Sequence, residues 1–350
     1  MSQGQNFDRE VREQPEAHER LLARGRDQAE AIAEAIRDAE PNLIVIVARG
    51  SSGNAAVYAK YLLGMRNGFP VTLAAPSMFT LYQQPPRLGR AVVIGISQSG
   101  QSADIVAVEE AARQQGALTV AITNHPESPL AAAADYCLPL HAGPEYAVAA
   151  TKTYTNQLMA LALLSTALRG EDADADWEAL AAIPAAAEAA LCLNTGIAEQ
   201  VERFRHVDRF AVIGRGYNLA TAHEIALKIK ETTYTMAHSY SSADFLHGPV
   251  AMIEPGFPVL LIAPSGATLD NTAGLLGLLE ERAAEVITIS DQEDLLARAG
   301  TPLPLPTGVP EWLTPVIAVI PGQLLAGALA AARGLDPDQP RGLSKVTVTH

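Results

Sequence analysis

Short runs rich in valine and isoleucine alternate along this chain with longer alanine-rich stretches. Such runs are typical of strands buried on both faces of a parallel sheet, and the longer stretches are typical of the helices that connect them. The predicted strands are Leu43–Ala48, Pro70–Ala75, Ala91–Ser97, Leu118–Asn124 and Tyr136–Leu140, followed by Phe210–Gly214, Met236–Tyr240, Pro258–Ala263 and Glu285–Ser290. The alternation predicts an α/β protein with parallel, doubly wound sheets.

The two series of strands are related by a constant offset of 166 positions. This offset places Arg49-Gly50 on Arg215-Gly216, Ser99-Gly100 on Ser265-Gly266, Asp104 on Asp270, and Gln157-Leu158 on Gln323-Leu324. Separated matches at one offset indicate two tandem copies of one fold, with two unrelated α/β domains as the alternative. The expected parts are an N-terminal helical segment over 1–34, a first domain over 35–170, a second domain over 171–335 and an extended tail over 336–350.

The stretch between the two series of strands is acidic over 170–176 and rich in alanine over 177–201. We expect the acidic run to be a solvated linker or a helix cap. The alanine-rich part is expected to form the first helix of the second domain.

Composition narrows the environment and the partners of the chain. Its 350 residues can form two cores without a metal or a disulfide, and Cys137 and Cys192 show no metal-binding spacing. A reducing, cytoplasmic location is expected. The polar N-terminus and the absence of a long apolar run predict no signal peptide and no membrane partner. The net charge of −14 disfavours nucleic acid, although a helix N-terminus could still bind an anionic metabolite.

The most informative local feature is the loop Ser97-Gln98-Ser99-Gly100-Gln101-Ser102, which lies between a predicted strand and a predicted helix over 103–115. Hydroxyl groups, a glycine and a helix N-terminus suit a phosphate group without any lysine. Ligands of open α/β sheets bind where this loop lies, at the carboxyl ends of strands. A turn that only caps its helix is the alternative. Gly50-Ser51-Ser52-Gly53-Asn54, after the first predicted strand, would face the same crevice.

Two segments nearly match common sequence motifs, but each lacks a required residue. Gly95-Ile96-Ser97-Gln98-Ser99 lacks the second glycine of the hydrolase nucleophile elbow. Gly214-Arg215-Gly216 is followed by Leu219 where the dinucleotide fingerprint needs glycine or alanine, and the sequence has no Walker lysine motif. The sequence therefore disfavours a serine hydrolase and a nucleotide-binding enzyme, and no cofactor is expected.

A predicted helix over 222–235 places Glu224, Lys228 and Glu231 on one face. Without other evidence, such a charged stripe indicates a solvated face. His247 lies in a tight turn, where it could be an acid–base group or could cap a neighbouring residue. His223 and His238 do not show zinc-binding spacing with His247, so no metal site is expected.

Seven ordered segments together resemble the sugar isomerase (SIS) domain family, specifically the tandem-SIS isomerase half of glucosamine-6-phosphate synthase, the glutamine-fructose-6-phosphate aminotransferase. The segments are Glu13-Gln14-Pro15, Gly50-Ser51-Ser52, Ser97-Gln98-Ser99-Gly100, Ala149-Ala150-Thr151-Lys152, Glu224–Glu231, His247-Gly248-Pro249 and the tail Asp338-Gln339-Pro340-Arg341-Gly342-Leu343-Ser344-Lys345. The resemblance covers nearly the whole chain. It implies two flavodoxin-like SIS domains followed by an extended C-terminal tail.

The resemblance also implies roles for individual residues. The residues implied to contact the sugar phosphate are Ser52, Ser97, Gln98, Ser99, Ser102, Val148 and Ser344. Glu231 is implied to be the general base that moves a proton between C1 and C2, with Lys228 beside it. His247, supplied by the neighbouring subunit of a homodimer, is implied to assist ring opening, and Lys345 to form an imine with a keto sugar.

Differences from the synthase favour the reverse of its reaction. Only about 42 residues precede the first predicted strand, so no glutaminase domain is expected in this chain. Without channelled ammonia, we expect a glucosamine-6-phosphate deaminase that isomerises the amino sugar and hydrolyses the imine to fructose 6-phosphate and ammonia. Gln101 and Ser344 stand where the synthase usually has Glu and Ala, which could indicate another amino sugar phosphate.

The alternatives to a deaminase fall into three classes. The first is an ammonia- or glutamine-dependent fructose-6-phosphate aminotransferase, and the second is another phosphosugar isomerase or a deglycase. The third is a sugar-phosphate sensor that binds its ligand without turnover. The candidate base, ring-opening group and imine lysine favour an enzyme over the sensor.

Overall fold

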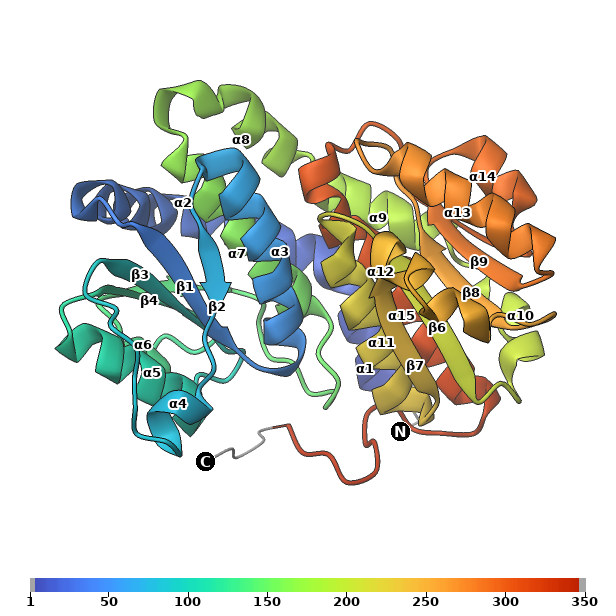
Figure 1. Ribbon diagram of the computed structural model, residues 1–350, viewed down its shortest axis with the longest axis horizontal. Coiled ribbons are helices and arrows are strands. Elements are labelled where there is room, and N and C mark those ends of the chain that lie inside the picture. Colours follow the sequence, from blue (N-terminus) through green and yellow to red (C-terminus); the bar gives the residue numbers. More distant parts are fainter. Residues whose placement is uncertain (1–3, 346–350) are drawn as a thin grey trace. The chain divides into compact units, whose positions relative to one another are not determined.

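Two five-stranded parallel sheets form the framework of the chain in the computed structural model, which describes residues 4–345 (Figure 1). The first sheet contains β1 (Leu43–Ala48), β2 (Val71–Leu73), β3 (Ala91–Ile96), β4 (Leu118–Thr123) and β5 (Tyr136–Pro139), in the order β2-β1-β3-β4-β5. The second contains β6 (Arg209–Gly214), β7 (Met236–Ser241), β8 (Pro258–Ile262), β9 (Glu285–Ser290) and β10 (Thr301–Pro304), in the order β7-β6-β8-β9-β10. Both sheets have the flavodoxin-like order 2-1-3-4-5, which confirms the predicted fold and its duplication.

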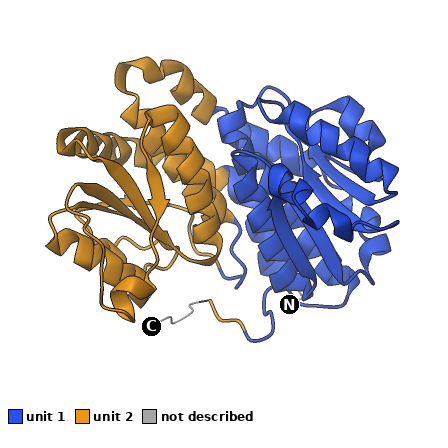
Figure 2. Cartoon of the chain, viewed as in Figure 1, with its two compact units in different colours: residues 1–15, 146–151, 182–342 blue, residues 16–145, 152–181, 343–350 orange. Residues whose placement is uncertain are grey.

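Contacts along the chain define two compact units, each with one of the sheets (Figure 2). Unit 2 comprises residues 16–145, 152–181 and 343–350, and holds the first sheet. Unit 1 comprises residues 1–15, 146–151 and 182–342, and holds the second sheet. The chain therefore passes from one unit to the other several times, whereas the parts expected from the sequence are the consecutive segments 1–34, 35–170, 171–335 and 336–350.

The helices of unit 2 lie around the first sheet. They are most of α2 (Gln14–Ala39), then α3 (Gly50–Asn67), α4 (Ser77–Thr80), α5 (Ala103–Gln114), α6 (Pro129–Ala133), α7 (Lys152–Leu168), the 3-10 helix η1 (Gly170–Ala173) and α8 (Asp174–Ala181). Val45, Val93 and Ala121 of the strands pack with Ile105 and Val108 of α5 in one buried cluster. This core fixes the position of the loop that joins β3 to α5.

The helices of unit 1 repeat this arrangement around the second sheet. They are α1 (Gln5–Arg12), α9 (Ile183–Leu193), α10 (Ile197–Gln200), α11 (Asn218–Thr233), α12 (Ser242–Leu246), α13 (Leu269–Glu281), α14 (Glu293–Arg298) and α15 (Thr314–Ala332), with the 3-10 helices η2 (Glu202–Phe204), η3 (Pro249–Met252) and η4 (Glu311–Leu313). Ile213, Val259 and Leu261 pack with Leu276 and Leu279 of α13 in the core.

The segment Glu311–Ala332, which includes α15, is long and apolar enough to cross a membrane by length and hydropathy alone. However, 78% of its most apolar window is buried inside the protein. α11 contacts α15 closely within unit 1. A helix that is apolar on every side is expected in a core as well as in a membrane, and here its burial accounts for its composition.

Two local predictions differ from the structure. The alanine-rich stretch is not one helix, because α8 ends at Ala181 and α9 at Leu193. The acidic run is not a linker: it forms η1 and the start of α8, and Asp176 forms ion pairs with Arg66 and Arg169. In addition, β10 was not predicted.

Candidate functional site

Two serine hydroxyl groups accept hydrogen bonds from backbone N–H groups within the loop after β3 in unit 2. Ser97 Oγ accepts a hydrogen bond from the Gly100 N–H (3.1 Å), and Ser99 Oγ accepts one from the Gln101 N–H (3.2 Å). Both hydroxyl groups act as acceptors here, so their own protons remain available to a ligand. Ser102 is the N-cap residue of α5, but its side chain makes no capping hydrogen bond. The capping alternative therefore does not describe Ser102.

Gly100 is required in this loop by two separate constraints. Its φ of +63° lies in the left-handed region, which is unfavourable for residues with a side chain. A Cβ atom there would also lie 2.0 Å from Ser128 Oγ and 3.1 Å from Thr123 Oγ1. The loop conformation thus depends on close packing between Gly100 and the segment after β4.

The turn after β1 meets this loop at the point where the strand order of the sheet reverses. Ala48 at the end of β1 pairs with Ile96 at the end of β3, so the two following segments begin side by side. The Arg49 guanidinium forms hydrogen bonds of 2.8 Å with the buried Asp104 carboxylate of α5. Ser52 is buried in the first turn of α3. Ligands of open α/β sheets bind at this reversal point, and the ion pair connects its two helix N-termini.

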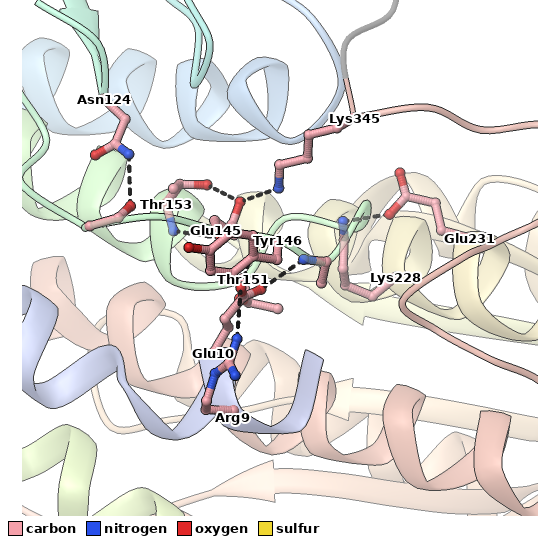
Figure 3. Close-up of polar contacts among 12 residues, drawn as sticks. Arg9, Glu10, Asn124, Glu145, Tyr146, Thr151, Thr153, Lys228, Glu231 and Lys345 are labelled. Carbon is pink, nitrogen blue, oxygen red and sulfur yellow. Dashed lines mark hydrogen bonds and ion pairs between the residues drawn. The ribbon is translucent and has the colours of Figure 1, made fainter. Parts of the chain in front are cut away.

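The second candidate group lies on α11 in unit 1. Lys228 is fully buried, and its Nζ lies 3.3 Å from Glu224 Oε1 and 2.5 Å from Glu231 Oε2 (Figure 3 shows the Lys228–Glu231 contact). The Glu224 side chain is 0% exposed, whereas that of Glu231 is 21% exposed. The array therefore runs from a buried carboxylate, through a buried ammonium, to a carboxylate that reaches solvent.

The solvated-stripe interpretation of this helix is wrong. Burial alone would lower the pKa of Lys228, but the carboxylates of Glu224 and Glu231 outweigh this effect and raise it above its usual value. The ammonium is consequently a permanent charge that fixes Glu231 in place. Helical spacing alone could not show this, because it does not reveal that both faces of α11 are covered.

Lys345, near the C-terminus, lies against a buried carboxylate in unit 2. Lys345 Nζ donates a hydrogen bond of 2.8 Å to Glu145 Oε2, whose side chain is 0% exposed (Figure 3). The same carboxylate accepts the Thr153 hydroxyl (2.7 Å) and the Thr153 backbone N–H (3.1 Å). The tail lysine therefore lies in a defined position.

Val148 lies in the short segment 146–151 of unit 1, which a second buried glutamate holds. Glu10 of α1 accepts hydrogen bonds from the backbone N–H groups of Tyr146 (2.5 Å) and Ala147 (3.1 Å). Figure 3 shows Glu10 beside Tyr146. Val148 follows directly and is partly exposed. Glu10 thus orients the backbone at the position predicted to contact the sugar.

The predicted residues fall into two groups. Unit 2 carries Ser52, Ser97, Gln98, Ser99, Ser102, Ser344 and Lys345, and unit 1 carries Val148, Lys228, Glu231 and His247. Ser344 is exposed, as is His247 at the end of α12. Within residues 4–345, no hydrogen bond or ion pair joins the His247 ring to Lys228 or Glu231. The structure brings together the serine loops in one unit and the charged array in the other.

The second copy of the serine loop is occupied by a side chain of the protein itself. Glu311 accepts hydrogen bonds from the Ala267 N–H (2.9 Å) and the Thr268 hydroxyl (3.2 Å) at the start of α13. A Cβ atom at Gly266 would lie 2.2 Å from Glu311 Cδ. In unit 1 an internal carboxylate is therefore bonded to the turn that corresponds to the serine loop of unit 2.

Sequence reasoning missed Glu10, Glu145 and Glu311, because none of them lies in a recognised motif. One available signal was the duplication, since the offset of 166 positions places Glu145 on Glu311. A glutamate present at the corresponding position of both copies was a candidate for a buried contact. For Glu10 the sequence offers no comparable signal.

The strand order of both units, with the serine loop at the reversal point of the first sheet, defines a tandem flavodoxin-like α/β protein. A model of the SIS domain matches residues 38–167 and 203–333. The chain belongs to the SIS domain family, with two SIS repeats.

Comparison with known proteins gives the same assignment. The chain is 37% identical to a glutamine–fructose-6-phosphate aminotransferase (isomerizing) of Thermococcus kodakarensis, covering 97% of this chain and 57% of that relative. It is 29% identical to the C-terminal domain of a glucosamine-fructose-6-phosphate aminotransferase from Francisella tularensis. That structural match has a TM-score of 0.86 and covers 96% of this chain and 98% of that one. A glucosamine-6-phosphate deaminase from Thermotoga maritima shares the fold at 21% identity. That match has a TM-score of 0.75 and covers 95% of this chain and 100% of that one. The chain thus spans little more than half the length of the aminotransferase it matches.

Proposed function

We propose that this protein is a phosphosugar isomerase that interconverts fructose 6-phosphate and glucosamine 6-phosphate, with ammonia as the nitrogen source or product. The observation that carries the proposal is the array on α11, in which a buried ammonium holds Glu231 at the edge of solvent. An aldose–ketose interconversion needs such a fixed carboxylate, because one proton must move between neighbouring carbons. The names of the relatives above 30% identity support the choice of sugar.

The serine loop of unit 2 provides the phosphate site of this proposal. Ser97 and Ser99 have hydroxyl protons available, and both residues lie just before the N-terminus of α5, where the helix dipole favours an anion. Ser52, Gln98 and Ser102 complete this phosphate and hydroxyl contact surface. Val148 contributes backbone contacts, and Ser344 lies next to the reacting lysine. Because Glu311 fills the corresponding turn of unit 1, each chain binds one sugar phosphate.

The chemistry divides between three groups. His247 assists opening of the sugar ring and comes from the second subunit of a homodimer. The Lys345 amine attacks the C2 carbonyl of the open ketose and forms an imine with loss of water, and ammonia then displaces the lysine. Glu231 removes a proton from C1 and returns it to C2, which gives glucosamine 6-phosphate. Run in reverse, the same steps release ammonia and fructose 6-phosphate.

The predicted deaminase is one direction of this interconversion. The relatives at 37% and 36% identity are named aminotransferases, a solved structure at 35% identity is named a phosphosugar isomerase, and the likeness to the deaminase structure, at 21% identity, concerns the fold alone. The proposal therefore covers both directions, and it includes a cytoplasmic location with no nucleic acid, membrane, metal or cofactor as partner.

The test is a pair of assays on the purified chain. With glucosamine 6-phosphate we expect fructose 6-phosphate and ammonia, and with fructose 6-phosphate and ammonium we expect glucosamine 6-phosphate. Unphosphorylated glucosamine is the control and should remain unchanged. Tight binding of either sugar phosphate without turnover in either direction would contradict the enzyme and favour a sensor.

A further inference from the structure

Glu145 is a buried carboxylate whose contacts point to a chemical role beyond those described above. Its oxygens accept hydrogen bonds from both Thr153 groups and from Lys345 Nζ (Figure 3). The segment before it is fixed as well. The Asn124 side chain donates to the Gly143 carbonyl (2.9 Å) and accepts the Ala142 N–H (3.0 Å). Glu145 therefore presents one oxygen to the lysine from a constrained backbone.

The duplication shows that this arrangement is not simply required by the fold. Glu311 occupies the same position in the second copy, yet its carboxylate bonds to the loop before α13 and no lysine side chain is hydrogen-bonded to it in the described chain. The corresponding glutamates of the two copies thus have different hydrogen-bond partners. Only in unit 2 does its carboxylate meet an amine at 2.8 Å.

We propose that Glu145 is a catalytic acid–base residue for imine formation at Lys345. The inference rests on the proposed function, in which Lys345 attacks the ketose carbonyl. Glu145 takes one proton from the Lys345 ammonium, and the neutral amine adds to C2 to give a carbinolamine. Glu145 then returns this proton to the C2 hydroxyl, which leaves as water. The ammonium and the carbonyl are thereby converted to an iminium ion and water, and the carboxylate is regenerated.

Borohydride trapping in the presence of fructose 6-phosphate measures this step. Mass spectrometry of the Lys345 peptide over time gives the rate of adduct formation. We expect Glu145→Gln to slow it about 100-fold, the lower end of the range for general acid–base catalysis. The matched control is Glu311→Gln, which makes the same change at the duplicated position and should leave the rate unchanged.

Two further measurements separate catalysis from a structural role. Glucitol 6-phosphate has no carbonyl group, so its binding reports on folding and on the phosphate site but not on imine formation. We expect Glu145→Gln to bind it as the wild type does. If that variant does not fold, Glu145→Ala with added formate or acetate decides the matter, because small carboxylic acids should restore trapping at rates that depend on the acid used.

The outcomes distinguish this inference from the proposed function. If the wild type is never labelled at Lys345, the imine step of the proposed function fails, and the role of Glu145 fails with it. If the wild type is labelled and Glu145→Gln is labelled equally fast, only the role of Glu145 is overturned. Failure of both small acids to restore trapping in Glu145→Ala would overturn it as well.

Discussion

Replacing Lys228 by methionine should destabilise the protein strongly, although it exchanges one buried side chain for another of similar size. Lys228 Nζ contacts carboxylates on both sides, and the Glu224 side chain is 0% exposed. Without the ammonium, the Glu224 carboxylate remains buried without its counter-ion. Burial of an uncompensated charge, rather than loss of packing, is the cost.

The magnitude follows from the exposure of the two glutamates. Removing one member of a buried ion pair costs about 3–5 kcal/mol. Glu231 is 21% exposed and can regain water, so Glu224 bears most of the cost, and we expect a loss near 3 kcal/mol. The loss should shrink as the pH falls, because protonation of the orphaned carboxylate removes its charge. The raised pKa of Lys228 means that its own stabilisation is present at all pH values below about 10.5, so it adds no pH dependence there.

Chemical denaturation of the wild type and Lys228→Met at pH 5 and pH 8 measures both effects. Lys230, an exposed neighbour on the same helix, provides the control. Lys230→Met should change the free energy of unfolding by less than about 0.5 kcal/mol. A Lys228→Met variant as stable as the wild type at pH 8, or a deficit that does not change with pH, would refute the reasoning.

Three further predictions concern single residues. Burial lowers the pKa of His18 to about 4, so as the pH falls this histidine takes up a proton in the unfolded chain before it does so in the folded protein. The free energy of unfolding should therefore fall by about 3 kcal/mol between pH 6.5 and pH 4. Denaturation curves of His18→Gln should lack this loss. Gly100→Ala should weaken glucitol 6-phosphate binding, measured by calorimetry, about tenfold or more. The control Gly116→Ala, also at positive φ but with open space around the added Cβ atom, should leave binding unchanged. Equal losses of affinity in the two variants would count against the steric argument. Ser99→Ala should weaken binding of the sugar phosphate far more than that of the free sugar, and the matched Ser265→Ala should affect neither; an equal effect of both variants would contradict a single site per chain.

The strands that determine the fold could be predicted because their burial gives them a distinctive composition. β1, for example, is Leu-Ile-Val-Ile-Val-Ala, and its predicted bounds match the structure. β10 escaped prediction because Pro302 and Pro304 argue against a strand. They are tolerated there because β10 lies at the edge of its sheet, where one side of the backbone needs no partner.

The candidate site was less predictable than the fold, for a physical reason. The serine loop lies in one continuous segment, so its residue types and spacing were visible in the sequence. The contact between Glu145 and Lys345 joins positions 200 residues apart. The burial of Glu224 depends on what covers α11, which no helical periodicity can show.

Exchange of hydrogen at C1 tests the central claim, that Glu231 moves a proton on the sugar, most directly. Fructose 6-phosphate incubated with the protein in D₂O should gain deuterium at C1, as followed by mass spectrometry. We expect Glu231→Gln to reduce the exchange rate about 100-fold while glucitol 6-phosphate binding is kept, and the exposed control Lys230→Gln to leave it unchanged. Undiminished exchange in Glu231→Gln would contradict the account.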